Sequence, residues 1–229
     1  MPSVLSQLFR RPPGSGWLVL SGGSPIDEHV ERTLALVEHA GTVVAVVPEA
    51  EFLRPAEEAL DPWIAFTGWN GKAVDCGSPE IVEEEVSEAT LILLPDCAEA
   101  HRYVEALNQT DAGEFLLAAL DGGAVIVAAG SAAEALGELI ADPGAELIPD
   151  PVGGDGGNRS GRPALGWVPN AIIQSHFIAG TPVPAALKRK DLFRIGLPEG
   201  ASIALGPKDE REIWGEEKPV ITFRGWWNA

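Results

Sequence analysis

Short, uninterrupted apolar runs alternate with longer amphipathic stretches over the first two thirds of the chain. The clearest runs are 17–20, 43–47, 91–94 and 124–127. Runs of this length are typical of strands that are covered on both faces, as in parallel sheets. Between the first two runs, apolar residues recur at helical spacing from Ile26 to Val37, so residues 17–47 predict a β-α-β unit.

The same pattern predicts further elements along the chain. Helices are expected at 55–65, 79–88, 98–107 and 112–120, with a short strand at 72–76. A helix is expected to open at Gly130-Ser131 and to run to about residue 141. Residues 151–163 are too rich in glycine for regular structure and predict a surface loop, either a connector or a lid.

The last third of the chain has a different character. A strand is expected at 171–173, followed by short alternating segments at 192–195, 202–205, 212–214 and 220–223. These segments predict antiparallel strands at one edge of a sheet. Together the pattern predicts an α/β three-layer sandwich with a mostly parallel central sheet, formed as one domain by residues 16–229. Residues 1–15 are expected to be a flexible N-terminal arm.

Charge narrows the choice of partners. The 229 residues carry 16 Lys and Arg against 34 Asp and Glu, a net charge of −18. Nucleic acids and anionic membranes attract basic surfaces, so neither is an expected partner. No apolar run has the length of a membrane span, no signal-peptide pattern occurs, and only two cysteines are present, so a cytoplasmic protein is expected. The tryptophan-containing segment 219–227 is compatible with a homodimer.

Ser131 is the most informative candidate for chemistry. A buried strand, a tight Gly130-Ser131 turn and a helix start follow one another, which is the arrangement of a nucleophile elbow. The helix start would also offer backbone N–H groups to a developing oxyanion. Serine is equally a common helix cap, so this context alone leaves both roles open.

A serine nucleophile needs a base, and His176 is the best placed of the four histidines. It follows the strand expected at 171–173, and open α/β sheets place their sites at strand ends. A third group would orient the imidazole. Among the carboxylates between the two residues, Glu146 is the first choice and Asp150 the second, whereas Glu134 and Glu138 are expected to face solvent.

Cysteine and metal chemistry are weaker alternatives. Cys97 and His101 are four residues apart and would share a helix face if the helix began early enough. The histidines and cysteines lack the spacing of metal ligands, and the glycine-rich segments lack the pattern of a phosphate loop. We therefore expect neither a metal nor a cofactor.

These landmarks together resemble the aspartyl dipeptidase and cyanophycinase family of serine peptidases. The matching segments, in the family's order, are an opening strand and glycine turn at 18–23, the nucleophile segment at 124–133, a segment ending in His-Phe at 165–177, and a late strand at 202–205. The resemblance implies a class I glutamine amidotransferase-like, flavodoxin-like fold. It also implies cleavage of a peptide or amide bond, with Ser131 as nucleophile, His176 as base and Glu146 as third group. Backbone amides near Gly22, Gly23 and Ala132 would then hold the oxyanion.

Three departures from the family pattern support a second reading. Ala133 replaces a glycine after the serine, and Gln174 replaces an aspartate before the histidine. Pro95-Asp96 stands where the family has a glycine pair, so Asp96 would bring a carboxylate to the oxyanion position. The sequence therefore predicts a divergent serine hydrolase, and the alternative is a catalytically degenerate member that binds a small ligand or a protein.

Overall fold

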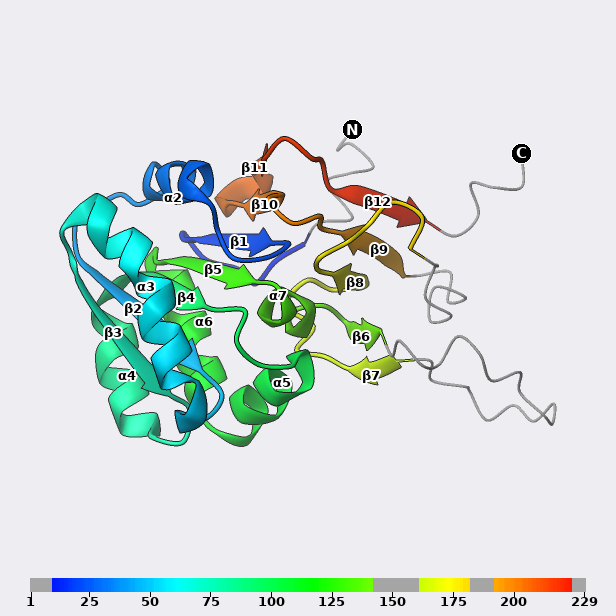
Figure 1. Ribbon diagram of the computed structural model, residues 1–229. Helices are drawn as coiled ribbons and strands as arrows, with labels where there is room; N and C mark the ends of the chain where they lie inside the picture. The colour runs from blue at the N-terminus through cyan, green and yellow to red at the C-terminus, as the bar shows by residue number, and fades with distance from the viewer. Residues whose placement is uncertain (1–9, 142–160, 182–191, 224–229) are drawn as a thin grey trace.

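A seven-stranded sheet forms the centre of the molecule (Figure 1). The computed structural model describes residues 10–141, 161–181 and 192–223. The strand order is β11-β10-β1-β5-β4-β2-β3, in which the five strands from β1 to β3 pair in parallel. The strands are β1 (Trp17–Ser21), β2 (Thr42–Val47), β3 (Asn70–Asp75), β4 (Ala89–Leu94), β5 (Val125–Ala129), β10 (Ser202–Leu205) and β11 (Arg211–Trp214).

Helices cover both faces of this sheet (Figure 1). On one face lie α2 (Asp27–Leu34) and α3 (Leu53–Thr67), the latter preceded by the short helix η1 (Ala50–Phe52). On the other face lie α4 (Pro79–Glu88), α5 (Ala100–Gln109) and α6 (Ala112–Gly122). None of these described helices is long and apolar enough to cross a membrane. The prediction of a three-layer α/β fold with a mostly parallel sheet is confirmed.

Alternation along each strand divides the core into two halves. Leu18 and Leu20 of β1 pack with α4, α5 and α6, whereas Val19 between them packs with α2 and α3. Successive side chains of a strand point to opposite faces, so a run without polar residues must be covered on both sides. This is why the continuous apolar runs identified the central strands.

The C-terminal strands divide between two sheets. The antiparallel edge expected at 202–205 and 212–214 is confirmed, because β10 pairs antiparallel with both β1 and β11. The other two segments belong elsewhere. A separate three-stranded sheet has the order β12-β9-β8 and consists of β8 (Ala171–Gln174), β9 (Phe193–Gly196) and β12 (Val220–Phe223). It brings the end of β8 towards the end of β1.

The helix expected from Ser131 to residue 141 is much shorter than predicted. Helix α7 spans Ser131–Ala135, and the chain then forms β6 (Leu139–Ala141), which pairs with β7 (Gly161–Pro163). A Cβ at Gly137 would lie 2.8 Å from the Ala171 carbonyl oxygen, and Glu138 N–H donates to that same oxygen at 2.7 Å. This close approach to β8 ends the helix. Residues 151–160 of the predicted loop lie outside the described residues.

The predicted N-terminal arm is described from residue 10 onwards. The Arg11 guanidinium donates to the Gly206 carbonyl at 2.9 Å and to the Gly14 carbonyl at 2.7 Å. Ser15 Oγ donates to the Asp121 carbonyl at 2.8 Å. These bonds attach residues 11–15 to the loops at the ends of β10 and α6.

Candidate active site

The ends of four strands meet at one place in the structure. β1 ends at Ser21, β4 at Leu94 and β5 at Ala129, all at the carboxyl edge of the parallel sheet, and β8 ends beside them at Gln174. Open α/β sheets bind their ligands at this edge, because the loops that follow parallel strands meet there. The loops after β4, β5 and β8 carry Asp96, Ser131 and His176.

The strained residue of the turn between β5 and α7 is Gly130. Its backbone has φ 54° and ψ −124°, a conformation that side-chain-bearing residues rarely adopt. Its N–H donates to the Ser21 carbonyl at 2.9 Å, which fixes the turn against β1. In a nucleophile elbow, the residue at this strained position carries the reactive side chain. Here the position has no side chain, and Ser131 follows it by one residue.

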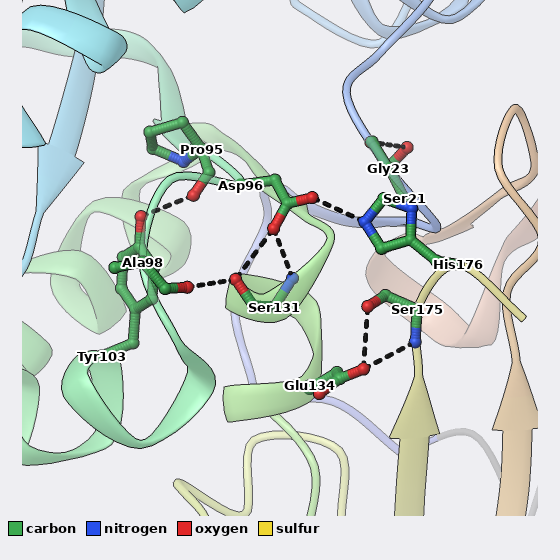
Figure 2. A network of polar contacts seen from close by, with 10 residues as sticks. All are labelled: Ser21, Gly23, Pro95, Asp96, Ala98, Tyr103, Ser131, Glu134, Ser175 and His176. Carbon is green, nitrogen blue, oxygen red and sulfur yellow. Dashed lines mark hydrogen bonds and ion pairs between the residues drawn. The ribbon is translucent and has the colours of Figure 1, made fainter.

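Asp96 occupies the space in front of Gly130. A Cβ built on Gly130 would overlap the carboxylate carbon of Asp96 and both of its oxygens. Asp96 Oδ1 accepts the Ser131 backbone N–H at 2.9 Å and faces Ser131 Oγ at 2.9 Å (Figure 2). The carboxylate of the neighbouring loop therefore lies where a side chain at the strained position would project.

Ser131 and His176 both contact Asp96 (Figure 2). The Ser131 hydroxyl donates to Asp96 Oδ1 or to the Ala98 carbonyl, two acceptors that compete for its single proton. His176 Nε2 lies 2.7 Å from Asp96 Oδ2. Within the described part of the chain, no hydrogen bond joins Ser131 directly to His176, because the carboxylate lies between them.

Backbone contacts hold His176 at the edge of the site. Its N–H donates to the Gly22 carbonyl at 2.8 Å, and its φ is 46°. A Cβ on Gly23 would lie 3.1 Å from the imidazole Cε1, so the ring packs closely against this glycine. The side chain is 51% exposed. The sequence-based expectation that His176 follows a strand end at this site agrees with its position after β8.

Glu134 is a member of this polar network that sequence reasoning placed in solvent. Its Oε1 accepts the Ser175 N–H at 2.9 Å and the Ser175 hydroxyl at 2.8 Å (Figure 2). Burial raises the pKa of the Glu134 carboxyl, and the two bonds from Ser175 oppose that rise. The short helix α7 lies against β8, and this packing brings Glu134 to Ser175. The preferred third group, Glu146, and the second choice, Asp150, lie outside the described residues.

Two solved structures have a similar fold. A peptidase from an acI-B1 Actinobacterium superposes with a TM-score of 0.69 at 14% identity, covering 92% of each chain. A putative peptidase E protein from Listeria monocytogenes EGD-e superposes with a TM-score of 0.60 at 13% identity, covering 89% of this chain and 100% of that one.

The chain has the fold of these peptidases. Neither the protein-family models nor the curated protein sequences contain a match. At such low identity the likeness concerns the fold, so the chemistry must be argued from the residues of the site.

The backbone amides that were expected to form an oxyanion hole make other contacts or are buried. Gly22 N–H donates to the Ala201 carbonyl at 2.9 Å, so it is part of the backbone network. Gly23 lies beside the His176 ring, and Ala132 is buried within α7. The N–H of the residue after the strained position belongs to Ser131, and the Asp96 carboxylate accepts it. Asp96 thus accepts an N–H group at the start of α7.

Cys97 and His101 do not form the thiolate–imidazole pair that their spacing allowed. α5 begins at Ala100, after Cys97, so the two residues do not share a helix face. Cys97 Sγ lies 3.5 Å from the Tyr103 hydroxyl, whereas His101 Nδ1 lies 3.3 Å from Glu99. Burial raises the pKa of the Cys97 thiol, which disfavours the thiolate form that reacts. In the described ranges, no group of three or more His, Cys, Asp or Glu side chains could hold a metal ion.

Two hollows flank the loop that carries Asp96. The first has a volume of about 310 Å³ and lies between α3 and the ends of β4 and β5, with Trp63, Pro62 and Asp96 in its lining. The second is more open, about 560 Å³, and is lined by Phe52, Arg102 and Ser131 among others. Asp96 lines both hollows.

Proposed function

We propose that this chain is a non-hydrolytic member of the peptidase fold that binds a small ligand at the carboxyl edge of its sheet. One observation carries the proposal: the strained position of the turn after β5 is occupied by Gly130, with the Asp96 carboxylate in front of it. A serine hydrolase that uses a nucleophile elbow carries its nucleophile at that position. The degenerate member that the sequence left open is therefore the reading that the geometry supports best.

Two further contacts support the loss of serine chemistry. The Ser131 N–H would stabilise an oxyanion in an active enzyme, yet it donates to the Asp96 carboxylate at 2.9 Å. A negative charge at this point disfavours a developing oxyanion, and removal of a single oxyanion donor already costs about 10²–10³ in turnover. His176, the base in the hydrolase that the sequence predicts, directs Nε2 at Asp96 rather than at a hydroxyl.

The hydrolase that the sequence suggested, with Ser131 as nucleophile, His176 as base and Glu146 as third group, has one observation in its favour. Ser131, Asp96 and His176 form a continuous chain of contacts at 2.9 and 2.7 Å. In such an enzyme the Ser131 hydroxyl would have to leave Asp96 and reach His176. The two candidate functions therefore differ in what the Ser131 hydroxyl does.

Treatment of the wild-type protein with a fluorophosphonate, followed by intact mass measurement, tests the proposal. We expect no adduct, and we expect a panel of dipeptides to remain uncleaved by both the wild type and the Ser131→Ala variant. A wild-type adduct on Ser131, together with peptide turnover that disappears in Ser131→Ala, would overturn the proposal and establish the hydrolase.

A further inference from the structure

The 310 Å³ hollow beside Asp96 has an apolar wall that contains several conformationally restricted side chains. Four prolines line it, Pro25, Pro55, Pro62 and Pro95, together with the indole of Trp63 and the side chain of Ala59. Proline rings and a buried indole lose little conformational freedom when a ligand binds. The volume lies at the lower end of the usual range for small-molecule sites, so the occupant would be compact.

The charges of this hollow have a single sign. Of the described residues that line it, two carry charge, and these are the carboxylates Asp96 and Glu58. The basic Arg102 lines the other hollow, where its guanidinium pairs with Glu49 and Glu51. An anionic ligand would meet like charge at both carboxylates, whereas a cationic ligand would complement both.

The Asp96 carboxylate is held in place by its neighbours. Its carboxylate is held by the Ser131 N–H at 2.9 Å and by His176 Nε2 at 2.7 Å, and its side chain is 20% exposed. A carboxylate offers about four lone-pair sites, and the contacts with Ser131 and His176 use at most three of them. Asp96, which lines the hollow, therefore has at least one acceptor site that these two residues do not use.

Glu58 is the second carboxylate that lines the hollow. Its side chain is 67% exposed and lies 3.3 Å from the Arg54 guanidinium, one helical turn away on α3. Exposed pairs of this kind contribute little to stability, so Glu58 can exchange Arg54 for a ligand cation at small cost. The hollow is thus lined by one largely buried carboxylate, Asp96, and one largely exposed carboxylate, Glu58.

We infer that this hollow binds a small organic ammonium ion with an apolar body, its ammonium group on Asp96 and its body against Trp63 and the prolines. The inference rests on the proposed function, since it names the ligand class of the same site. A protonated primary amine supplies the donor that the free acceptor site of Asp96 requires. The indole of Trp63 adds an apolar surface that also attracts cations.

Calorimetric titration with three matched compounds tests the charge requirement. Benzylamine is the cation, benzyl alcohol its neutral counterpart and benzoate its anion, and cyclohexylamine and hexylamine vary the apolar body. We expect at least one amine to bind saturably and benzyl alcohol and benzoate to bind at least about tenfold more weakly, as a charge-assisted hydrogen bond requires. Equal binding of benzylamine and benzyl alcohol, or binding by none of the amines, would overturn the inference.

Variants of the two carboxylates locate the bound amine. Asp96→Asn keeps an acceptor for the Ser131 N–H but removes the charge, and amine affinity should fall at least about tenfold. Glu58→Gln should weaken binding by about twofold to fivefold. Glu57→Gln removes a charge from an exposed neighbour on α3 that does not line the hollow, and it should change nothing. Ala59→Trp fills the hollow and should abolish binding while Asp96 stays in place.

The outcomes separate the ligand from the function. Amine binding that depends on Asp96, together with a fluorophosphonate adduct on Ser131, would sink the non-hydrolytic function and keep the ligand class. Amine binding that Asp96→Asn leaves unchanged in a variant with wild-type thermal stability would sink the ligand assignment, whatever the fluorophosphonate shows.

Discussion

At the scale of single residues, the site depends on a pairing between Gly130 and Asp96. The carboxylate lies in the space that a side chain at position 130 would occupy, so each residue limits what the other can be. Glycine also relieves the strain of a positive φ in this turn. The two residues are therefore best treated as one unit, although they are far apart in sequence.

Gly130→Ala should destabilise the fold strongly in the wild-type background. The alanine would have to adopt φ 54°, and its Cβ would displace the Asp96 carboxylate. Together these two effects cost about 2–4 kcal/mol of unfolding free energy. In an Asp96→Gly background only the strain remains, so the loss should be smaller. Chemical denaturation of the two single variants and the double variant measures this coupling, and additive losses would contradict the pairing.

A second residue-scale prediction concerns Glu134. Burial raises the pKa of its carboxyl above the ordinary value of 4.5, so the folded state binds this proton more tightly than the unfolded state. The stability that this group contributes is complete below about pH 4.5 and is lost as the pH rises through the raised pKa. Glu134→Gln should therefore be more stable than the wild type at pH 7 and equally stable near pH 4.

Thermal unfolding of Glu134→Gln at several pH values checks this difference. The amide oxygen of glutamine can still accept the Ser175 N–H, so the contact with the end of β8 remains. Glu83→Gln on the exposed face of α4 is the matched control and should show no such pH dependence. A wild type that is more stable than Glu134→Gln at pH 7 would show that the ionised carboxylate stabilises the fold.

At the scale of elements, helix α2 is attached to the antiparallel edge of the sheet by a buried histidine. His29 is 1% exposed, its Nδ1 lies 3.2 Å from Ser202 Oγ on β10, and its ring lies 6.4 Å from the ring of Trp214 on β11. Burial lowers the pKa of His29, against a smaller opposing effect of Glu28. The neutral imidazole is therefore the form that this packing accommodates.

Acid should lower the stability of the fold through this histidine. Because the pKa of His29 is lower in the folded state than its ordinary value of 6.5, the unfolded state binds the proton more tightly. The stability contributed by the neutral ring is complete above about pH 6.5 and is lost as the pH falls through the lowered pKa. His29→Gln should reduce the loss of thermal stability between pH 7 and pH 5, whereas His39→Gln at an exposed position should not. Equal pH dependence in all three proteins would contradict this role.

Much of the element structure was predictable from the sequence, and the misses have local causes. The runs at 91–94 and 124–127 identified β4 and β5, because strands buried on both faces contain only apolar residues. The length of α7 was overestimated, since its end depends on the contact of Gly137 with Ala171 in β8. Neither residue signals that contact in the sequence, so Glu134 was wrongly placed in solvent.

The places of the candidate residues at strand ends were predictable, but which residue of the turn is strained was not. His176 and Asp96 were both expected near it, because each follows a strand that ends at the same edge. The sequence assigned the reactive place in the turn to Ser131, whereas the structure puts Gly130 in the strained conformation. Glycine and serine are both common in such turns, and only the backbone dihedral angles distinguish which one occupies the strained place.

At the scale of the whole molecule, this chain has the fold of two peptidases that differ from it at most positions of the sequence. The two peptidases with similar folds share only 13–14% of residues with this chain, yet they cover most of its length. A buried sheet tolerates exchange among apolar residues if volume and pattern are kept. A catalytic turn has no such latitude, because a single residue at the strained position decides whether a nucleophile is present.

Restoration of the nucleophile tests the central claim most directly. The measurement is the fluorophosphonate adduct, and the dipeptide turnover, of the double variant Gly130→Ser and Asp96→Gly beside the wild type and Asp96→Gly alone. We predict an adduct on the new serine at position 130 in the double variant only, because it alone has a hydroxyl at the strained position and a vacated Ser131 N–H. An adduct on Ser131 in the wild type, or in Asp96→Gly alone, would contradict the account and return Ser131 to the role of nucleophile.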